Sequence, residues 1–204
     1  MGAITQPVTT IAPDISSFGA GGQMYMADIW GGFNVSSETN NPLFSFRATD
    51  GNVTNARQLT NLNEAQKVGS TMAFRATKLG IRVLNFGTGV LTPAQAEEIK
   101  RLLASAVISI TVGSNETKVA EFSGLDFMQP ADFVAADSTN TCAATGGLGG
   151  GIGWITLQVP IEIQANVNIG GMVKFTRAVP AALTSTPNSF GFVVLLQGLK
   201  VVKS

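Results

Sequence analysis

The strongest constraint on the fold is a run of alternating apolar and polar residues at positions 155–169. Its apolar parity holds Ile155, Leu157, Val159, Ile161, Ile163, Ala165, Val167 and Ile169. Strict alternation is typical of a β-strand with one buried face, because successive side chains of a strand point to opposite sides. Fully extended, the run would measure about 50 Å, roughly twice a typical strand. Pro160 cannot donate to a strand ladder, so it marks a kink, an edge strand or a junction between two strands.

Several other segments also have strand character. They are 43–46, 72–76, 79–83, 108–112, 117–122 and 172–179, together with the final run 190–202. The final run is at first apolar on both parities, which is typical of a strand buried on both faces. A shift of register is expected near Lys78, and Gly113-Ser114-Asn115 predicts the turn of a hairpin.

One helix is predicted, at 92–106. Thr92 is a good N-cap, Pro93 suits the first helical position, and Gln95 completes a capping box. Apolar residues recur at helical spacing along one face, at Ala96, Ile99, Leu102, Leu103 and Ala106. Together these elements predict an all-β fold, a single jelly roll or β-sandwich of about eight strands with one short helix.

The beginning of the chain lacks a clear period. Prolines and glycines interrupt it, and only 24–30 has strand character. We therefore predict an extended N-terminal arm at 1–42, followed by a single β-sandwich domain at 43–204. The glycine-rich stretch 137–153 fits neither a dinucleotide-binding nor a phosphate-loop pattern, and we interpret it as a flexible loop between strands.

Histidine is absent, and Cys142 is the only cysteine. Histidine is the commonest metal ligand and the side chain that ordinarily titrates near neutral pH, so the usual zinc sites and catalytic triads are excluded. One cysteine cannot form an internal disulfide. Without a histidine partner, Cys142 is interpreted as a free thiol rather than a nucleophile.

The charges of the chain are few and balanced. Thirteen Lys and Arg residues face thirteen Asp and Glu residues, and no basic residue precedes Arg47. Proteins that hold nucleic acid by counterion release need clustered basic residues, commonly in an arm or patch. We therefore expect no direct binding of nucleic acid.

Carboxylate pairs are the remaining catalytic resource, because glycosidases need two carboxyl groups across a cleft. The candidate pairs are Asp126 with Asp132, Glu97 with Glu98, and Glu121 with Glu162. Glu121 and Glu162 lie on the polar parities of separate strands, so adjacency is neither required nor forbidden. We predict that the chain is not an enzyme and has no catalytic, cofactor-binding or metal-binding residues. A carboxylate enzyme is kept as an alternative.

Three aromatic residues, Trp30, Trp154 and Tyr25, raise the alternative of a carbohydrate-binding or receptor-binding β-sandwich module. Rings that bind sugars form an exposed platform. Each of these three rings is instead close to glycine and apolar residues in the sequence, which favours packing in the core or an interface.

The composition of the surface points to self-association. Charged residues make up 13% of the chain, against about 25% in a typical soluble domain. Exposed apolar area on a monomer, and long strands with few edge charges, both favour aggregation unless they are covered. Assembly of identical copies would cover both.

The order of these elements resembles a known family. The helix at 92–106 leads into Val107-Ile108-Ser109-Ile110-Thr111-Val112-Gly113, and a long amphipathic strand begins with Trp154-Ile155-Thr156-Leu157-Gln158-Val159-Pro160-Ile161. Over about residues 70–204 the chain resembles jelly-roll capsid proteins of tailless icosahedral bacteriophages, including those whose shells surround an internal membrane.

The resemblance implies a structural virion protein that is made in the host cytoplasm and forms homo-oligomeric capsomers of an icosahedral shell. It implies no enzymatic activity and no cofactor, and packaging of the genome by other proteins. Contacts with other virion proteins, and with an internal virion membrane where one is present, are further expectations. A minor virion protein of the same fold, such as a penton, cement or spike-base protein, is the alternative within this class.

Overall fold

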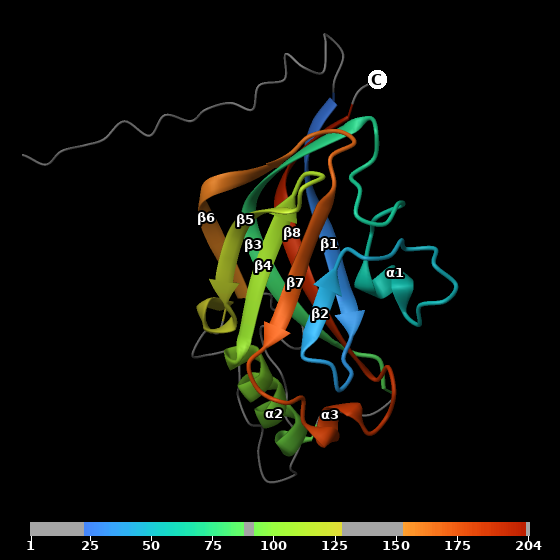
Figure 1. The fold of residues 1–204 in the computed structure, drawn as a ribbon, viewed down its shortest axis with the longest axis vertical. Helices are drawn as coiled ribbons and strands as arrows, with labels where there is room; N and C mark the ends of the chain where they lie inside the picture. Colours follow the sequence, from blue (N-terminus) through green and yellow to red (C-terminus); the bar gives the residue numbers. More distant parts are fainter. Residues whose placement is uncertain (1–22, 88–91, 128–152, 203–204) are drawn as a thin grey trace, which may run out of the picture.

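A computed structural model of the chain describes residues 23–87, 92–127 and 153–202. These residues form two antiparallel four-stranded sheets that pack face to face (Figure 1). The first sheet has the order β1-β8-β3-β6, and the second has the order β2-β7-β4-β5. The strands are β1 Gln23–Asn34, β2 Asn40–Leu43, β3 Met72–Asn85, β4 Ala106–Val112, β5 Thr117–Ser123, β6 Gly153–Ile163, β7 Ile169–Phe175 and β8 Phe190–Val202.

The pairing of the strands is that of a jelly roll. β1 pairs with β8, β2 with β7, β3 with β6, and β4 with β5, all antiparallel. The eight strands are therefore paired as if one long hairpin, with its turn between β4 and β5, had been rolled into two sheets. The predicted all-β jelly-roll sandwich is confirmed.

The predicted boundary of the N-terminal arm at residue 42 is wrong. β1 lies before that boundary and pairs with β8 along its whole length, and β2 crosses it. The alternation of apolar and polar residues in β1 stops at Gly31 and Gly32. Both glycines are required there because neighbouring atoms leave no room for a Cβ. A Cβ at Gly31 would lie 2.7 Å from Cγ of Phe44, and one at Gly32 would meet the carbonyl oxygen of Phe192. Residues 1–22 of the predicted arm lie outside the described residues.

The long alternating run forms two strands rather than one. β6 ends at Ile163, and β7 begins at Ile169. Between them Asn166 takes a left-handed conformation with φ 62°, which asparagine tolerates better than most residues. Pro160 lies in β6, an outermost strand of the first sheet, so the expected edge position is confirmed.

The core fills the space between the inner faces of the two sheets. Near the end of the sandwich that holds α2 and α3, it contains a group of three phenylalanine rings from both sheets. Phe33 of β1 stacks on Phe192 of β8 with ring centroids 5.4 Å apart, and Phe175 of β7 meets both rings edge-on. All three side chains are buried.

The predicted helix is present as α2, Pro93–Ala104, between β3 and β4. Its capping box is formed as expected, because the backbone N–H of Gln95 donates to Oγ1 of Thr92 at 3.2 Å and the backbone N–H of Thr92 donates to Oε1 of Gln95 at 3.0 Å. The helix ends two residues before the predicted bound, and Ala106 instead begins β4. None of the described helices is long and apolar enough to cross a membrane.

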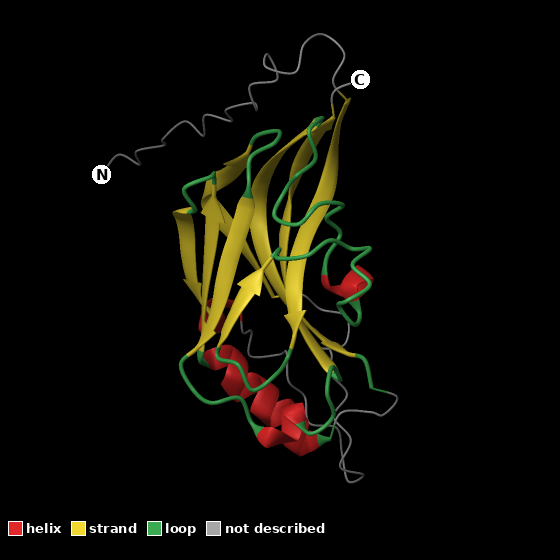
Figure 2. Cartoon of the chain, turned by 45° about the vertical axis from the view of Figure 1, so that its right-hand side comes forward, coloured by secondary structure: helices red, strands yellow, loops and turns green. Residues whose placement is uncertain are grey.

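Three further short helices connect strands: α1 Ala56–Leu59, η2 Gly124–Phe127 and α3 Ala181–Thr184. Figure 2 shows α2 and α3 together at one end of the sandwich. Nη2 of Arg177, just after β7, lies 3.1 Å from Oε2 of Glu98 on α2 and helps to hold this end together.

The β1 edge of the sandwich is covered by the chain itself. The connection between β2 and β3 runs along β1. There Oδ1 of Asn61 accepts from the backbone N–H of Trp30 at 3.0 Å, and Nδ2 of Asn61 donates to the carbonyl of Asp28 at 2.8 Å. Oγ1 of Thr60 donates to the carbonyl of Trp30 at 3.0 Å. These bonds occupy ladder groups that an edge strand would otherwise leave open.

Candidate interaction surface at the open edge of the sandwich

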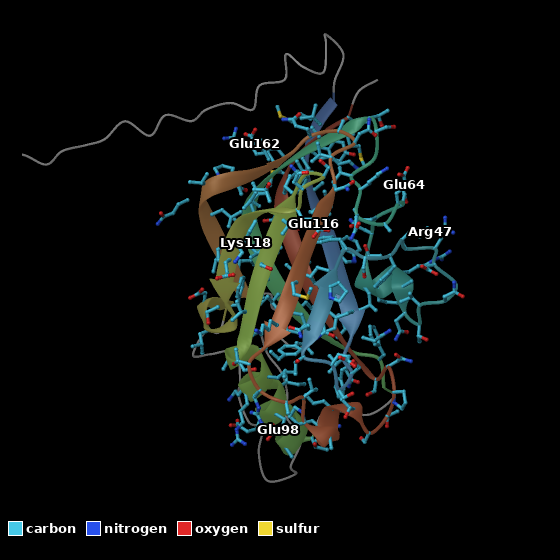
Figure 3. The ribbon with its side chains drawn as sticks, viewed as in Figure 1. Arg47, Glu64, Glu98, Glu116, Lys118 and Glu162 are labelled. Atoms are coloured by element: carbon cyan, nitrogen blue, oxygen red, sulfur yellow. The ribbon has the colours of Figure 1, made fainter. Side chains whose placement is uncertain are left out.

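The opposite side of the sandwich, where β5 and β6 are the outermost strands, contains a groove of about 890 Å³. It is lined by residues 119–122 of β5, by Asp126 of η2, and by residues 155–162 of β6. Figure 3 labels Lys118 on β5 and Glu162 on β6 on this side of the molecule. We call this surface the open edge.

Bulges in both edge strands shape the groove. In β6, Ile161 pairs with Ala76 of β3, and Thr156 pairs with Lys78. Between these pairs β6 has residues 157–160, whereas β3 has only Thr77. Residues 157–160 therefore form a bulge. In β5, Val119 is the extra residue between positions that pair with Ile110 and Thr111. A bulge bends its strand and interrupts the ladder.

The groove has an apolar floor and an apolar rim. Ala120 and Phe122 of β5, with Ile155 and Leu157 of β6, are half-buried and pack against the core. On the rim Val159 is 80% exposed and Val119 is 46% exposed, and Leu125 of the neighbouring η2 is 58% exposed. The remaining exposed large apolar side chains of the described residues are Met24, Tyr25 and Met26 at the start of β1, and Met172 on β7.

Sequence reasoning missed Val159. The alternation of 155–169 places Val159 on the apolar parity, which predicts a buried side chain. The bulge instead turns it outward. The neighbouring Pro160 was the available signal, since proline in a strand marks an edge or a bulge.

The structure brings the predicted carboxylates Glu121 and Glu162 to the two rims of one groove. Each has a basic partner: Oε2 of Glu121 lies 2.6 Å from Nζ of Lys118, and Oε1 of Glu162 lies 3.5 Å from Nε of Arg75. Both glutamate side chains are more than half exposed. A general acid is usually held in an apolar pocket, and neither glutamate is in one.

The other carboxylate candidates have structural partners or lie elsewhere. Asp126 lines the same groove, and its Oδ2 accepts the backbone N–H of Ser123 at 3.0 Å. Glu97 and Glu98 are on α2, where they pair with Lys100, Arg101 and Arg177. Asp132 lies outside the described residues, as do Cys142 and most of the glycine-rich stretch 137–153. Among the residues that the structure describes, no cluster of three or more acidic or cysteine side chains is arranged to hold a metal ion.

The ion pair between Arg75 and Glu162 gives a first prediction. Replacing Glu162 with glutamine should change the free energy of unfolding by no more than about 1 kcal/mol, because its side chain is 55% exposed and the carboxylate stays hydrated without the ion pair. Urea denaturation measures this change, with Glu116→Gln in the exposed turn after β4 as the control. A markedly larger loss in the Glu162 variant would show that this pair, rather than apolar packing, holds β6 on the sheet.

The tryptophans are packing residues, as the sequence predicts. Trp30 on β1 and Trp154 on β6 are partly buried against a second apolar layer on the outer face of the first sheet, which contains Leu195. Tyr25 differs: it is 44% exposed, and Nζ of Lys200 lies 5.5 Å from its ring centroid. The three rings therefore do not form one exposed platform.

No model of a known protein family matches this chain, and no curated protein matches its sequence. The geometry of the open edge is therefore the basis for a functional interpretation.

Proposed function

We propose that this chain is the structural subunit of a virion shell, assembling into an icosahedral lattice through apolar, weakly charged surfaces. The observation that carries the proposal is the open edge, where Val119, Leu125 and Val159 are exposed beside a groove with an apolar floor. Apolar surface of this kind on a soluble chain marks a contact with another molecule.

The jelly roll supports the proposal without deciding it. The same architecture serves viral capsids, lectins and cupins, so the site has to discriminate between them. Histidine is absent from the sequence, which removes the commonest ligand for a metal centre. The packing of Trp30 and Trp154 leaves a sugar-binding platform without its two largest rings.

The proposal also covers where the subunit is made and what it contacts in the virion. The subunit would be made in the host cytoplasm and become part of the virion, in contact with other copies and other virion proteins. The balanced charge of the chain, thirteen basic against thirteen acidic residues, fits a shell that leaves the genome to other proteins. A major shell subunit and a minor penton, cement or spike-base protein would differ in copy number per particle. Contact with an internal membrane is proposed only for a shell that encloses one.

Sedimentation velocity of the purified full chain at rising concentration tests the proposal. We expect discrete species much larger than the monomer. Because the contacts are apolar, these species should persist at high ionic strength and grow with added sulfate, whereas contacts made by exposed charges would weaken. A single monomeric species at every concentration and in both salts would contradict the proposal.

A further inference from the structure

We propose that the open edge binds the open edge of a second copy across a two-fold axis, with Lys118 of each copy facing Glu121 of the partner subunit. This inference rests on the proposed function in requiring that copies associate. Beyond the proposed function, it specifies the surface, the symmetry and the pairing of charges for one of the contacts between copies. Figure 1 shows β5 and β6 on the same side of the sandwich, where this contact would form.

Extension of a sheet by strand addition does not suit this edge. Residues 157–160 of β6 form a bulge that includes Pro160, which has no N–H to donate. β5 carries its own bulge at Val119 and a lysine next to it. Bulges, prolines and lysines are the features by which proteins prevent edge-to-edge pairing of strands. The contact at this edge therefore buries side chains of β5 against those of the second copy rather than lengthening a ladder.

The charges on β5 are arranged to complement themselves. Lys118 pairs with Thr111 and Glu121 pairs with Ser109, two positions apart on β4, so the bulge at Val119 places both charges on one face. A two-fold axis between residues 119 and 120 brings position 118 of one copy opposite position 121 of the other. The contact then contains two identical ion pairs, each between Lys118 of one copy and Glu121 of the other, as an isologous contact requires.

The composition of the open edge selects a partner without a strong net charge. The β5 rim holds one acid and one base, Glu121 and Lys118, and the β6 rim holds Glu162, which pairs with Arg75 of the adjacent strand β3. On the β5 rim the exposed side chain of Val119 is apolar and lies at the proposed axis, and on the β6 rim the exposed Val159 is apolar too. A second copy offers the same neutral rims and apolar centre, and the whole chain has a formal net charge of zero.

Charge reversal tests the contact in a way that separates it from folding. Lys118→Glu carries two acids on this face, and Glu121→Lys carries two bases. Each variant alone should lose association at this edge, with a dimer dissociation constant raised about tenfold or more, because like charges would face each other across the axis. An equimolar mixture should restore association as a heterodimer. Lys174→Glu, on the exposed outer face of β7, is the matched control and should behave as the wild type.

The readout is native mass spectrometry of the two variants, alone and mixed, with one of them uniformly labelled with ¹⁵N so that the heterodimer has its own mass. Heterodimers in the mixture together with weakened homodimers support the proposal. If the single variants associate as the wild type does, the contact between copies lies elsewhere and the inference is overturned, while the proposed assembly stands. The groove could then be covered by residues 1–22 or 128–152 of the same chain. Variants that fail both alone and mixed would also overturn it. A wild-type chain that stays monomeric would overturn the inference and the proposed function together.

Folding is checked independently. The Lys118–Glu121 pair is exposed, so either reversal should leave the thermal unfolding midpoint nearly unchanged. Should one of them unfold, Val119→Asp is the second variant, because Val119 lies at the proposed axis, is 46% exposed and belongs to no core cluster. It should weaken the homodimer without a change in the unfolding midpoint. Unchanged association of Val119→Asp would count against the contact.

Discussion

Replacing Phe192 with alanine is expected to lower the free energy of unfolding by about 3–5 kcal/mol. The ring of Phe192 is 1% exposed, stacks on Phe33 and meets Phe175 edge-on. These rings come from both sheets, so the truncation removes apolar contacts and leaves a cavity where the two layers meet. Urea denaturation measures the loss, at a protein concentration low enough to keep self-association from adding to stability.

Phe122→Ala is the matched control for this prediction. Phe122 is on the edge strand β5, half-buried beside the groove, with Phe127 as its ring neighbour. Because the site is open to water, the truncation leaves no closed cavity and should cost clearly less than the change at Phe192. Equal losses at the two positions would mean that the buried packing between the two sheets contributes no more to stability than the half-buried packing at the open edge.

Replacing Gly198 with alanine is expected to destabilise the fold by about 3 kcal/mol, through crowding of backbone against backbone. Gly198 pairs with Ala76 at the point where the register between β3 and β8 shifts. A Cβ there would meet the carbonyl oxygen of Arg75 and lie 2.8 Å from Cα of Ala76. Neither neighbour is the flexible end of a side chain, so the two central strands of the first sheet would have to move apart.

Gly51→Ala provides the comparison for that substitution. A Cβ at Gly51 would have no atom within 4 Å. Alanine at such a site restricts the unfolded chain and should be neutral or stabilising by up to about 1 kcal/mol. Thermal and chemical unfolding of both variants measure the difference. A Gly198 variant as stable as the Gly51 variant would contradict the close approach of β3 and β8.

Local patterns predict those elements whose signals are local. The alternation in β3, β4 and β6 and the capping box at Thr92 are set by side chains a few residues apart, and the structure contains all of them. Strand character was predicted for 24–30, but the place of β1 in the sandwich and its extension to Asn34 were missed, because Gly31 and Gly32 lie in it for a tertiary reason, the close approach of Phe44 and Phe192. No local pattern distinguishes such a glycine from one in a flexible arm.

The open edge depended even more on tertiary structure. Glu121 and Glu162 are placed correctly on polar parities, but only the jelly-roll topology makes β5 and β6 the outermost strands on the same side. The bulge at residues 157–160 arises from the pairing of β6 with β3, which alternation along the chain does not reveal. The exposure of Val159 therefore could not be predicted from alternation. Pro160 was a partial signal, since it excludes a central strand.

If identical copies cover the open edge, electron microscopy of the purified full chain should show that contact. Particles should be imaged over a range of protein concentrations, and the averaged assemblies compared with the jelly roll. We predict closed, symmetric particles in which neighbouring sandwiches meet at β5 and β6. Fields of separate single sandwiches at the highest concentration, or assemblies in which β5 and β6 face open solvent, would contradict the claim.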